Sequence, residues 1–163
     1  MTFTYPEVGA TRLALVEGGP LPAGYDHVLR HVPIESAFDP AAAALAAWRP
    51  QRGAGLDVRT DADRAAVGVR FTTGIGVGPL RLWAPCEIVW LVDEADRFGF
   101  GFGTLEGHPE AGEEGFLVSV ADGRVWFDVA AFSRPAKWWV RVGHAFARKL
   151  QARVTDRYVR AMG

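Results

Sequence analysis

The sequence predicts an α+β fold in which a curved antiparallel sheet of about seven strands wraps around a long C-terminal helix. The first observation is an alternation of apolar with polar or small residues, the period of a β-strand, in several segments between residues 67 and 129. The second is an apolar stripe near the end of the chain, recurring at every fourth position: Trp138, Val142, Phe146, Leu150, Val154 and Tyr158. That spacing is typical of an amphipathic helix, and an antiparallel sheet with one apolar face requires such a cover.

The chain begins with a segment, residues 1–24, that is rich in Gly and Pro and is expected to form an ordered leader. Its start has no basic region followed by an apolar run, so it does not resemble a signal peptide. The following segment YDHVLRHVPI, residues 25–34, alternates in the manner of a first strand.

An alanine-rich stretch then predicts a helix near residues 40–48. Asp39 has the chemistry of an N-cap, and Pro50 is expected to end the helix. Residues 51–64 are polar and indicate a loop, with room for a short strand at 56–60.

The alternating segments that follow predict successive antiparallel strands with short turns. The residues expected to share a side within each strand are Val67, Val69 and Phe71; Cys86, Ile88, Trp90 and Val92; Phe98, Phe100 and Phe102; Phe116, Val118 and Val120; and Val125, Phe127 and Val129. Asp122-Gly123 is a strong hairpin signal between the last two of these strands. The final helix is expected to begin at Ser133 or Pro135 and to end at Gly163. This is the helix-grip arrangement, and we expect one such domain over residues 1–163 with the leader packed on it.

Composition restricts the classes of partner. The formal net charge of the 163 residues is −1, which does not favour a nucleic-acid partner. No apolar run is long enough to cross a bilayer, so stable membrane insertion is not expected. Cys86 is the only cysteine, which excludes an internal disulfide and favours a buried, inert thiol in a cytoplasmic protein.

Four segments of the chain together resemble a known family. They are YPEVGATR, FGFGTLEGHPEAGEE, VWFDVAAFSRPA and QARVTDRYVRAM, and they extend over nearly the whole sequence. They resemble the domain-of-unknown-function family nineteen-ninety of bacteria and plants, for which GTLxGHPExGEE is a specific motif. The resemblance implies membership of the helix-grip superfamily of the birch-pollen allergens, the START lipid-transfer domains and the polyketide cyclases. Many members of that superfamily hold an apolar ligand between the sheet and the helix.

Two glycine runs, Gly74–Gly78 and Gly99–Gly103, raise the question of a nucleotide site. A dinucleotide-binding fingerprint requires its glycines to open a helix, whereas another strand pattern follows each run here. The alternation instead indicates strands in which glycines occupy one face, so that this face carries no side chains. We favour sharp bending or close packing on that face over a ligand-lined surface.

The segment Glu106–Glu114 is the most charged short stretch and supplies the candidate catalytic residues, which are His108, Glu110, Glu113 and Glu114. A histidine beside carboxylates suits acid–base chemistry, but the spacing does not suit a metal, and no cofactor is expected. The alternative is a hydrophilic turn between strands whose carboxylates are solvated. We expect one of the last two glutamates to point inward and to take an arginine partner, from Arg70, Arg81, Arg97 or Arg124.

The final helix is strongly basic, with Lys137, Arg141, Arg148, Lys149, Arg153, Arg157 and Arg160 against a single acid, Asp156. An anionic membrane or nucleic acid is one possible partner for it. We favour a solvated outer face whose cations also suit a helix C-terminus.

Three functions follow from this description. The first is binding of a small apolar or amphipathic ligand between sheet and helix, at residues Arg70, Trp90, Phe100, Phe102, Trp138 and Trp139. The second is an enzyme that uses the same cavity, with His108 and a glutamate as acid and base. The third is an interaction module with a filled core. The sequence leaves the oligomeric state open.

Overall fold

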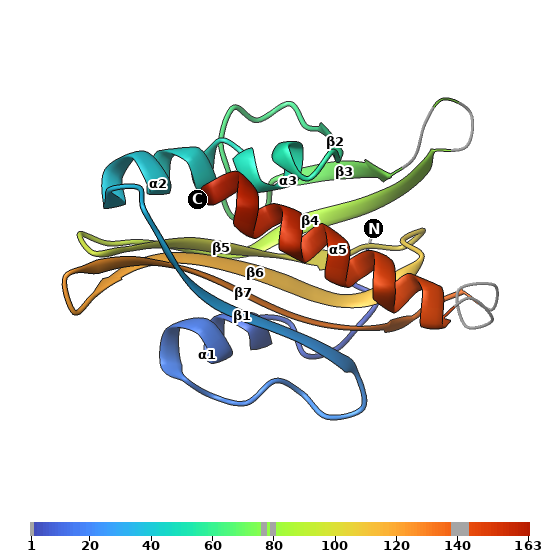
Figure 1. The fold of residues 1–163 in the computed structure, drawn as a ribbon. Helices are drawn as coiled ribbons and strands as arrows, with labels where there is room; N and C mark the ends of the chain where they lie inside the picture. The colour runs from blue at the N-terminus through green and yellow to red at the C-terminus, as the bar shows by residue number, and fades with distance from the viewer. Residues whose placement is uncertain (1, 76–77, 79–80, 138–143) are drawn as a thin grey trace.

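Seven strands form one antiparallel sheet, which confirms the predicted fold class, and their order is β1-β7-β6-β5-β4-β3-β2 (Figure 1). The computed structural model describes residues 2–75, 78, 81–137 and 144–163. The strands are β1 (Asp26–Ile34), β2 (Asp57–Arg59), β3 (Arg70–Ile75), β4 (Leu82–Asp93), β5 (Arg97–Thr104), β6 (Glu110–Ala121) and β7 (Arg124–Pro135). The helices are α1 (Ala10–Glu17), α2 (Phe38–Ala46), α3 (Arg49–Gly53) and α5 (His144–Met162).

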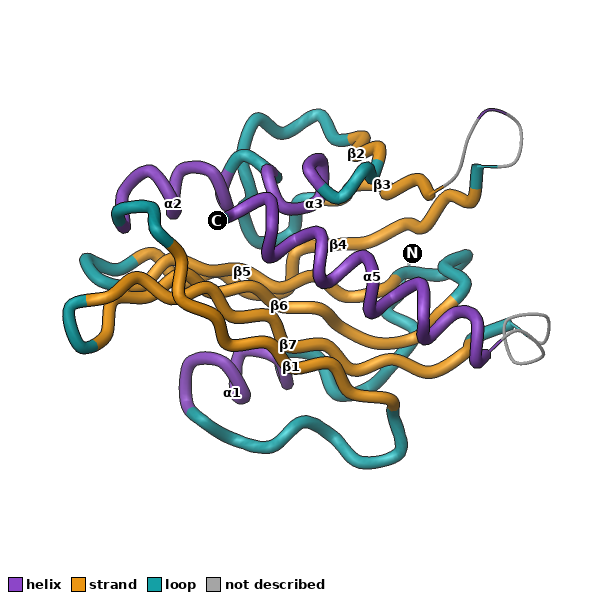
Figure 2. Tube along the Cα trace, in the orientation of Figure 1, coloured by secondary structure: helices purple, strands orange, loops and turns teal. Residues whose placement is uncertain are grey.

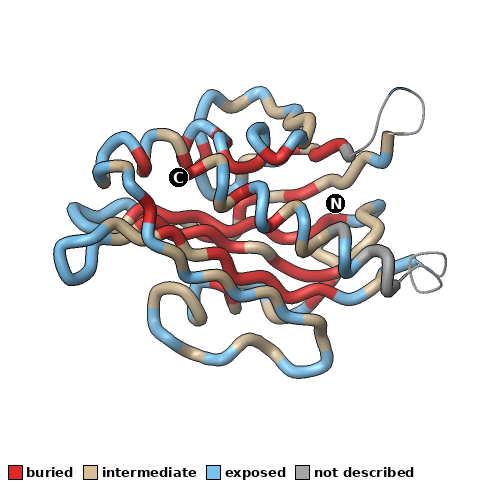
Figure 3. The backbone as a smooth tube through the Cα atoms, in the orientation of Figure 1, coloured by how far each residue is buried: buried red, intermediate tan, exposed pale blue. Residues whose placement is uncertain are grey.

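The helices lie on both sides of the sheet (Figure 1, Figure 2). Helices α2, α3 and α5 cover one side, which we call the inner face, and α1 with the rest of the leader covers the other, the outer face. On the inner face the ring of Tyr158 in α5 lies 5.2 Å from that of Phe116 in β6. On the outer face Thr11 of α1 hydrogen-bonds Glu113 of β6. Buried residues follow the central strands between the two covers (Figure 3).

The inner core is built from aromatic side chains in contact. We call the following residues the aromatic cluster: Trp48, Phe71, Phe100, Phe102, Phe116 and Tyr158. Each is buried, and Trp48, Phe100 and Phe116 have no exposed surface. Edge-to-face and tilted rings of this kind add specific geometry to the burial of apolar area. The cluster therefore fixes how α3 and α5 lie on the sheet.

The first strand and the last hairpin agree with the prediction. Strand β1 begins one residue later than expected, at Asp26. Asp122 and Gly123 have φ angles of 52° and 71°, the left-handed pair that a tight hairpin requires. Strand β2 lies within the loop region where a short strand was expected.

The predicted helix near residues 40–48 is instead a pair of helices. Trp48 has a left-handed φ of 63°, which separates α2 from α3. Pro50 therefore lies in the first turn of α3 rather than ending the preceding helix. The N-cap of α2 is Ala37, and Asp39 lies in its first turn.

The expected start of the final helix was wrong. Ser133 and Pro135 belong to β7, which is paired along its length with β6. The helix is described from His144 onward, and Trp138 and Trp139 lie outside the described residues. Helix α1 was not predicted at all within the leader.

Strand β4 contains a register shift that the alternation did not predict. Ile88 pairs with Phe102, whereas Trp90 pairs with Gly101, so Val89 is an extra residue between them. A bulge of this kind reverses the side on which later residues point. Trp90 therefore lies on the outer face, opposite Cys86 and Ile88, and the prediction that these residues share one face was wrong.

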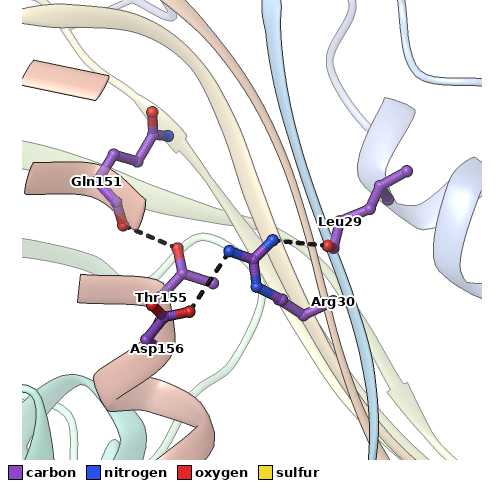
Figure 4. Close-up of polar contacts among 5 residues, drawn as sticks. All are labelled: Leu29, Arg30, Gln151, Thr155 and Asp156. Atoms are coloured by element: carbon purple, nitrogen blue, oxygen red, sulfur yellow. Dashed lines mark hydrogen bonds and ion pairs between the residues drawn. The ribbon is translucent and has the colours of Figure 1, made fainter. Parts of the chain in front are cut away.

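Helix α5 is also linked to the edge of the sheet (Figure 4). Arg30 of β1 reaches across to Asp156 of α5 at 3.4 Å, while also donating to the carbonyl of Leu29. The hydroxyl of Thr155 donates to the carbonyl of Gln151 one turn earlier, which satisfies this fully buried polar group. The helix thus presents an apolar inner side and a charged outer side.

Candidate functional site

Glu114 is a partly buried carboxyl group on the inner face of the sheet. It pairs with Phe102 in the sheet and lies beneath α5, where the hydroxyl of Tyr158 donates to it at 3.5 Å. No cationic side chain pairs with it among the described residues. Burial raises the pKa of Glu114 to about 8, and the charge of Glu110 adds to the effect. At neutral pH the group is therefore mostly a neutral acid, whose O–H is able to donate a hydrogen bond.

Tyr158 and Cys86 complete the surroundings of Glu114. Burial, and then the charge of Glu114, raise the pKa of both the Tyr158 hydroxyl and the Cys86 thiol. Cys86 is 1% exposed, as expected for a structural thiol, and a protonated thiol is a poor nucleophile. The functional groups of this site are therefore a weak acid, Glu114, and a phenol, Tyr158, beside aromatic rings.

Two further polar side chains in the inner core have no hydrogen-bond partner. The indole N–H of Trp48 and both amide atoms of Gln51 are buried and unpaired among the described residues. Trp48 belongs to the aromatic cluster: its ring is 4.6 Å from that of Phe71, which is 5.0 Å from that of Phe102, the strand partner of Glu114. An unpaired buried polar group costs about 1–3 kcal/mol. Unpaired donors and acceptors are expected where a ligand or ordered water supplies the partner.

Glu113 has the opposite environment, on the outer face. Its carboxylate accepts hydrogen bonds from the Tyr5 hydroxyl at 2.7 Å, the Gly9 N–H at 2.7 Å and the Thr11 N–H at 2.9 Å. The Thr11 hydroxyl donates to it as well. A carboxylate at the N-terminus of a helix satisfies its free N–H groups and its dipole. Glu113 therefore holds the leader on the sheet, and its oxygens are occupied.

The leader also packs against the outer face of β5, where the glycines of Gly99–Gly103 carry no side chains. A Cβ on Gly101 would lie 2.1 Å from the indole nitrogen of Trp90, and one on Gly103 would lie 2.1 Å from the hydroxyl oxygen of Tyr5. The indole N–H of Trp90 donates to the Thr11 hydroxyl at 2.8 Å. The glycines thus permit close packing on the outer face, the alternative that the sequence favoured over a ligand-lined surface.

His108 lies in the turn that precedes β6. Its Nδ1 lies 2.9 Å from both the backbone nitrogen and the carbonyl oxygen of Glu110, so it accepts from the N–H in one tautomer and donates to the carbonyl in the other. Burial lowers the pKa of His108 to about 4, so the ring is neutral at neutral pH. The carboxyl groups of Glu113 and Glu114 are hydrogen-bonded to other groups, those of the leader and of Tyr158 respectively, and not to His108. The ring therefore shapes the turn, and Glu110 to Glu114, expected partly in this turn, belong to β6.

The predicted ligand-binding residues that the structure describes do not converge at one place. Phe100 and Phe102 lie in the aromatic cluster, whereas Trp90 is on the outer face. Arg70 is exposed and pairs with Glu87 at 2.6 Å. The prediction of an arginine partner for the inward glutamate also fails, because Arg81 pairs with Asp57 and Arg97 with Glu94.

Sequence reasoning missed most of the polar side chains of the inner core. Tyr158 was placed correctly on the apolar stripe of the final helix, and its hydroxyl was the available signal for a polar contact within the core. Trp48 and Gln51 carried no such signal, because the left-handed backbone at Trp48, which ends α2 and starts α3, cannot be predicted from the spacing of apolar residues. No cluster of metal-ligating side chains is found in the described part of the chain. None of the described helices is long and apolar enough to span a membrane.

Comparison with known proteins decides the family. The profile described as Domain of unknown function (DUF1990) matches residues 4–161. The chain belongs to this family. A UPF0548 protein of Deinococcus radiodurans is 45% identical over 77 residues, which are 47% of this chain and 39% of that protein. A UPF0548 protein of Dictyostelium discoideum is 30% identical over 129 residues, which are 70% of this chain and 59% of that protein.

The chain thus spans 39% and 59% of the length of these two DUF1990 relatives. Solved structures share the fold at low sequence identity. A hypothetical protein of Helicobacter pylori has a TM-score of 0.63 and 12% identity, with coverage of 100% of this chain and 97% of that one. Ara h 8.0201 has a TM-score of 0.54 and 10% identity, with coverage of 85% and 99%. These likenesses confirm the helix-grip fold predicted from the sequence.

Proposed function

We propose that this DUF1990 protein binds a small amphipathic molecule between the inner face of the sheet and α5. The observation that carries the proposal is Glu114, a carboxyl group with a pKa of about 8 that lies against an aromatic cluster without a cationic partner. A buried polar group of this kind is costly unless it is hydrogen-bonded. Binding of a polar ligand group at Glu114 and Tyr158 would offset that cost.

The polar side chains of the inner core suggest the chemistry of the ligand. Protonated Glu114 and the Trp48 indole offer donors, the Tyr158 oxygen offers an acceptor, and Gln51 offers both. The rings of Phe71, Phe102 and their neighbours offer apolar contact. We expect an uncharged, largely apolar molecule that carries a hydroxyl or carbonyl group. The helix-grip superfamily supports the location, since many of its members hold apolar ligands there.

Native mass spectrometry of the purified protein tests the proposal. A co-purifying small molecule that is retained by the wild type and reduced in Glu114→Gln is the expected result. The Glu94→Gln variant is the control, because Glu94 lies in an exposed ion pair with Arg97 at the sheet surface. If extraction and soaking with long-chain alcohols, sterols and flavonoids yield no bound species, the inner core is a filled core and the proposal is wrong.

Glu114 also favours a second candidate, an acid–base enzyme that uses the same place. A carboxyl group with a pKa of about 8 is protonated at neutral pH and is suited to act as a general acid. In this version Glu114, with Tyr158 beside it, takes the role that the sequence suggested for His108. A turnover that is lost in Glu114→Gln, with ligand retained, would distinguish the enzyme from the binding protein.

Two further properties belong to this proposal. We take residues 1–163 as one domain, supported by the hydrogen bonds from the leader to Glu113. We also take the protein as cytoplasmic, which is supported by the single cysteine, a buried thiol. Fluorescence microscopy of a tagged chain and limited proteolysis test these points.

A further inference from the structure

Helix α3 and the last turns of α5 form an open depression lined by arginines, away from the inner core. Its volume is about 530 Å³, and its lining includes Arg49, Arg52, Arg157 and Arg160 together with Gly53 and Ala161. We call it the arginine hollow. The two helices lie side by side there (Figure 1), and they approach so closely that a Cβ on Gly53 would lie 2.5 Å from the Cβ of Ala161. Segments about a hundred residues apart in the chain thus contribute to one surface feature.

The four guanidinium groups have no carboxylate partner among the described residues. Arg49 donates from Nε to the carbonyl of Ala161 at 3.0 Å, and Arg157 donates to the carbonyl of Ala54 at 3.3 Å. These bonds hold both side chains at the rim of the arginine hollow and leave other N–H groups unused. The side chains of Arg52 and Arg160 are exposed and take part in no described hydrogen bond or ion pair.

This concentration of positive charge is more than the helix end requires. The C-terminus of a helix carries roughly half a negative charge, which one cation balances. Here Arg49 and Arg52, and likewise Arg157 and Arg160, stand three residues apart on their helices, a spacing at which like charges repel. The chain as a whole has a net charge of −1, so the excess is local. An arrangement that costs stability in the free protein is expected where a ligand offsets the cost.

From these observations we infer that the arginine hollow binds a phosphate group that carries two negative charges. Planar guanidinium groups match phosphate oxygens through paired N–H donors, and four of them around one hollow exceed what a single carboxylate needs. The phosphate belongs either to a soluble phosphorylated metabolite or to the headgroup of an anionic lipid. The hollow is a site distinct from that of Glu114, because Tyr158 points inward while its neighbour Arg157 points outward.

Isothermal titration calorimetry with pyrophosphate tests the inference. The Arg52→Ala/Arg160→Ala variant removes two cations that make no described contact, so its fold is expected to remain intact. Its affinity for pyrophosphate should fall by about tenfold or more. The matched control is Arg148→Ala/Arg153→Ala, which removes two cations from the same helix outside the hollow and should change affinity by less than about twofold. The Arg52→Lys/Arg160→Lys variant keeps the charge but loses the planar donors, and should be intermediate.

Thermal unfolding gives a second readout that does not depend on calorimetry. Without phosphate, Arg52→Ala/Arg160→Ala should melt no lower than the wild type, because like charges have been removed. Pyrophosphate should raise the Tm of the wild type and of the control variant, but not that of Arg52→Ala/Arg160→Ala.

Sedimentation with vesicles separates the two sources of phosphate. Arginine-dependent binding to phosphatidylcholine vesicles that contain phosphatidic acid, without binding of pyrophosphate, identifies a lipid headgroup. Arginine-dependent binding of pyrophosphate without vesicle binding identifies a soluble ligand. The inference is wrong if neither probe binds, or if both double variants lose affinity equally. The inference is also wrong if duplex DNA binds more tightly than either probe and its affinity falls equally in all the arginine variants, because binding would then depend on general positive charge.

Discussion

Glu113 and Glu114 are adjacent in the chain, but their side chains lie on opposite faces of the sheet, in different surroundings. Glu113 accepts hydrogen bonds from hydroxyl and backbone N–H groups of the leader. Glu114 faces aromatic rings and a single phenol, which favours the acid. Strand alternation was enough to predict that only one of them points inward. It was not enough to predict the partner, because the nearest polar group comes from α5, forty-four residues away in the chain.

The raised pKa of Glu114 makes stability depend on pH. A carboxyl group whose pKa is about 8 in the folded chain and 4.5 ordinarily binds more protons when folded, so stability falls as pH rises between these values. Glu114→Gln should therefore be more stable than the wild type near pH 9, by about 1–3 kcal/mol, and nearly equal to it near pH 4. Urea unfolding at both pH values measures the difference. A constant difference across the range would show that Glu114 does not titrate in this way.

The same substitution at Glu113 should have the opposite effect. Glu113→Gln replaces an acceptor-only group by an amide that donates as well, against hydroxyl and N–H donors. We expect a loss of about 2–4 kcal/mol at neutral pH, since a charge-assisted buried network is broken. Urea unfolding gives the magnitude, and hydrogen exchange should show lost protection at the amides of Gly9 and Thr11. Unchanged protection there would mean that Glu113 does not hold the leader.

At the scale of elements, the strands were predictable because their period is a local property. The bulge in β4 was not predictable, since the sequence Ile88-Val89-Trp90 is equally compatible with a regular strand and with an extra residue at Val89. Helix α1 was missed for a similar reason. It has eight residues and no side-chain cap of its own, and its N-terminus is completed by Glu113 on a distant strand. Local sequence predicts elements that stabilise themselves, and fails for those completed by tertiary contacts.

The glycines of β5 should be intolerant of any side chain on the outer face. In Gly101→Ala the new methyl group would overlap the Trp90 indole, with Thr11 close behind it. Overpacking of this kind costs about 1–3 kcal/mol, so the variant should unfold at lower urea than the wild type. Ser119→Ala is the control, because Ser119 is only half-buried on the same face, and its effect should stay within about 0.5 kcal/mol. Equal midpoints for the two variants would contradict the packing of Trp90 on the glycine face.

At the scale of the whole molecule, the sheet carries a core on each face, and each core has its own cover. The inner core lies under α2, α3 and α5, as the helix-grip arrangement predicts. The outer face also buries large side chains, among them Trp90, Leu117 and Phe132. Their cover is the leader, with Tyr5 packed edge-to-face on Phe132 at 5.5 Å. The fold therefore depends on a segment that the sequence predicts only as a Gly- and Pro-rich leader, without its helix.

Deletion of residues 2–18 should consequently expose an apolar surface on the outer face. Contiguous apolar patches on a soluble chain promote self-association, and the buried Glu113 would lose every described donor. We expect the shortened chain to form oligomers in size-exclusion chromatography with light scattering, and to bind the dye ANS. A synthetic peptide of residues 2–18, added in trans, should restore the monomer, whereas the same peptide with Thr11→Val should restore it less well. A monomeric shortened chain with an unchanged Tm would show that the leader is dispensable, and that the sheet and α5 are sufficient for the fold.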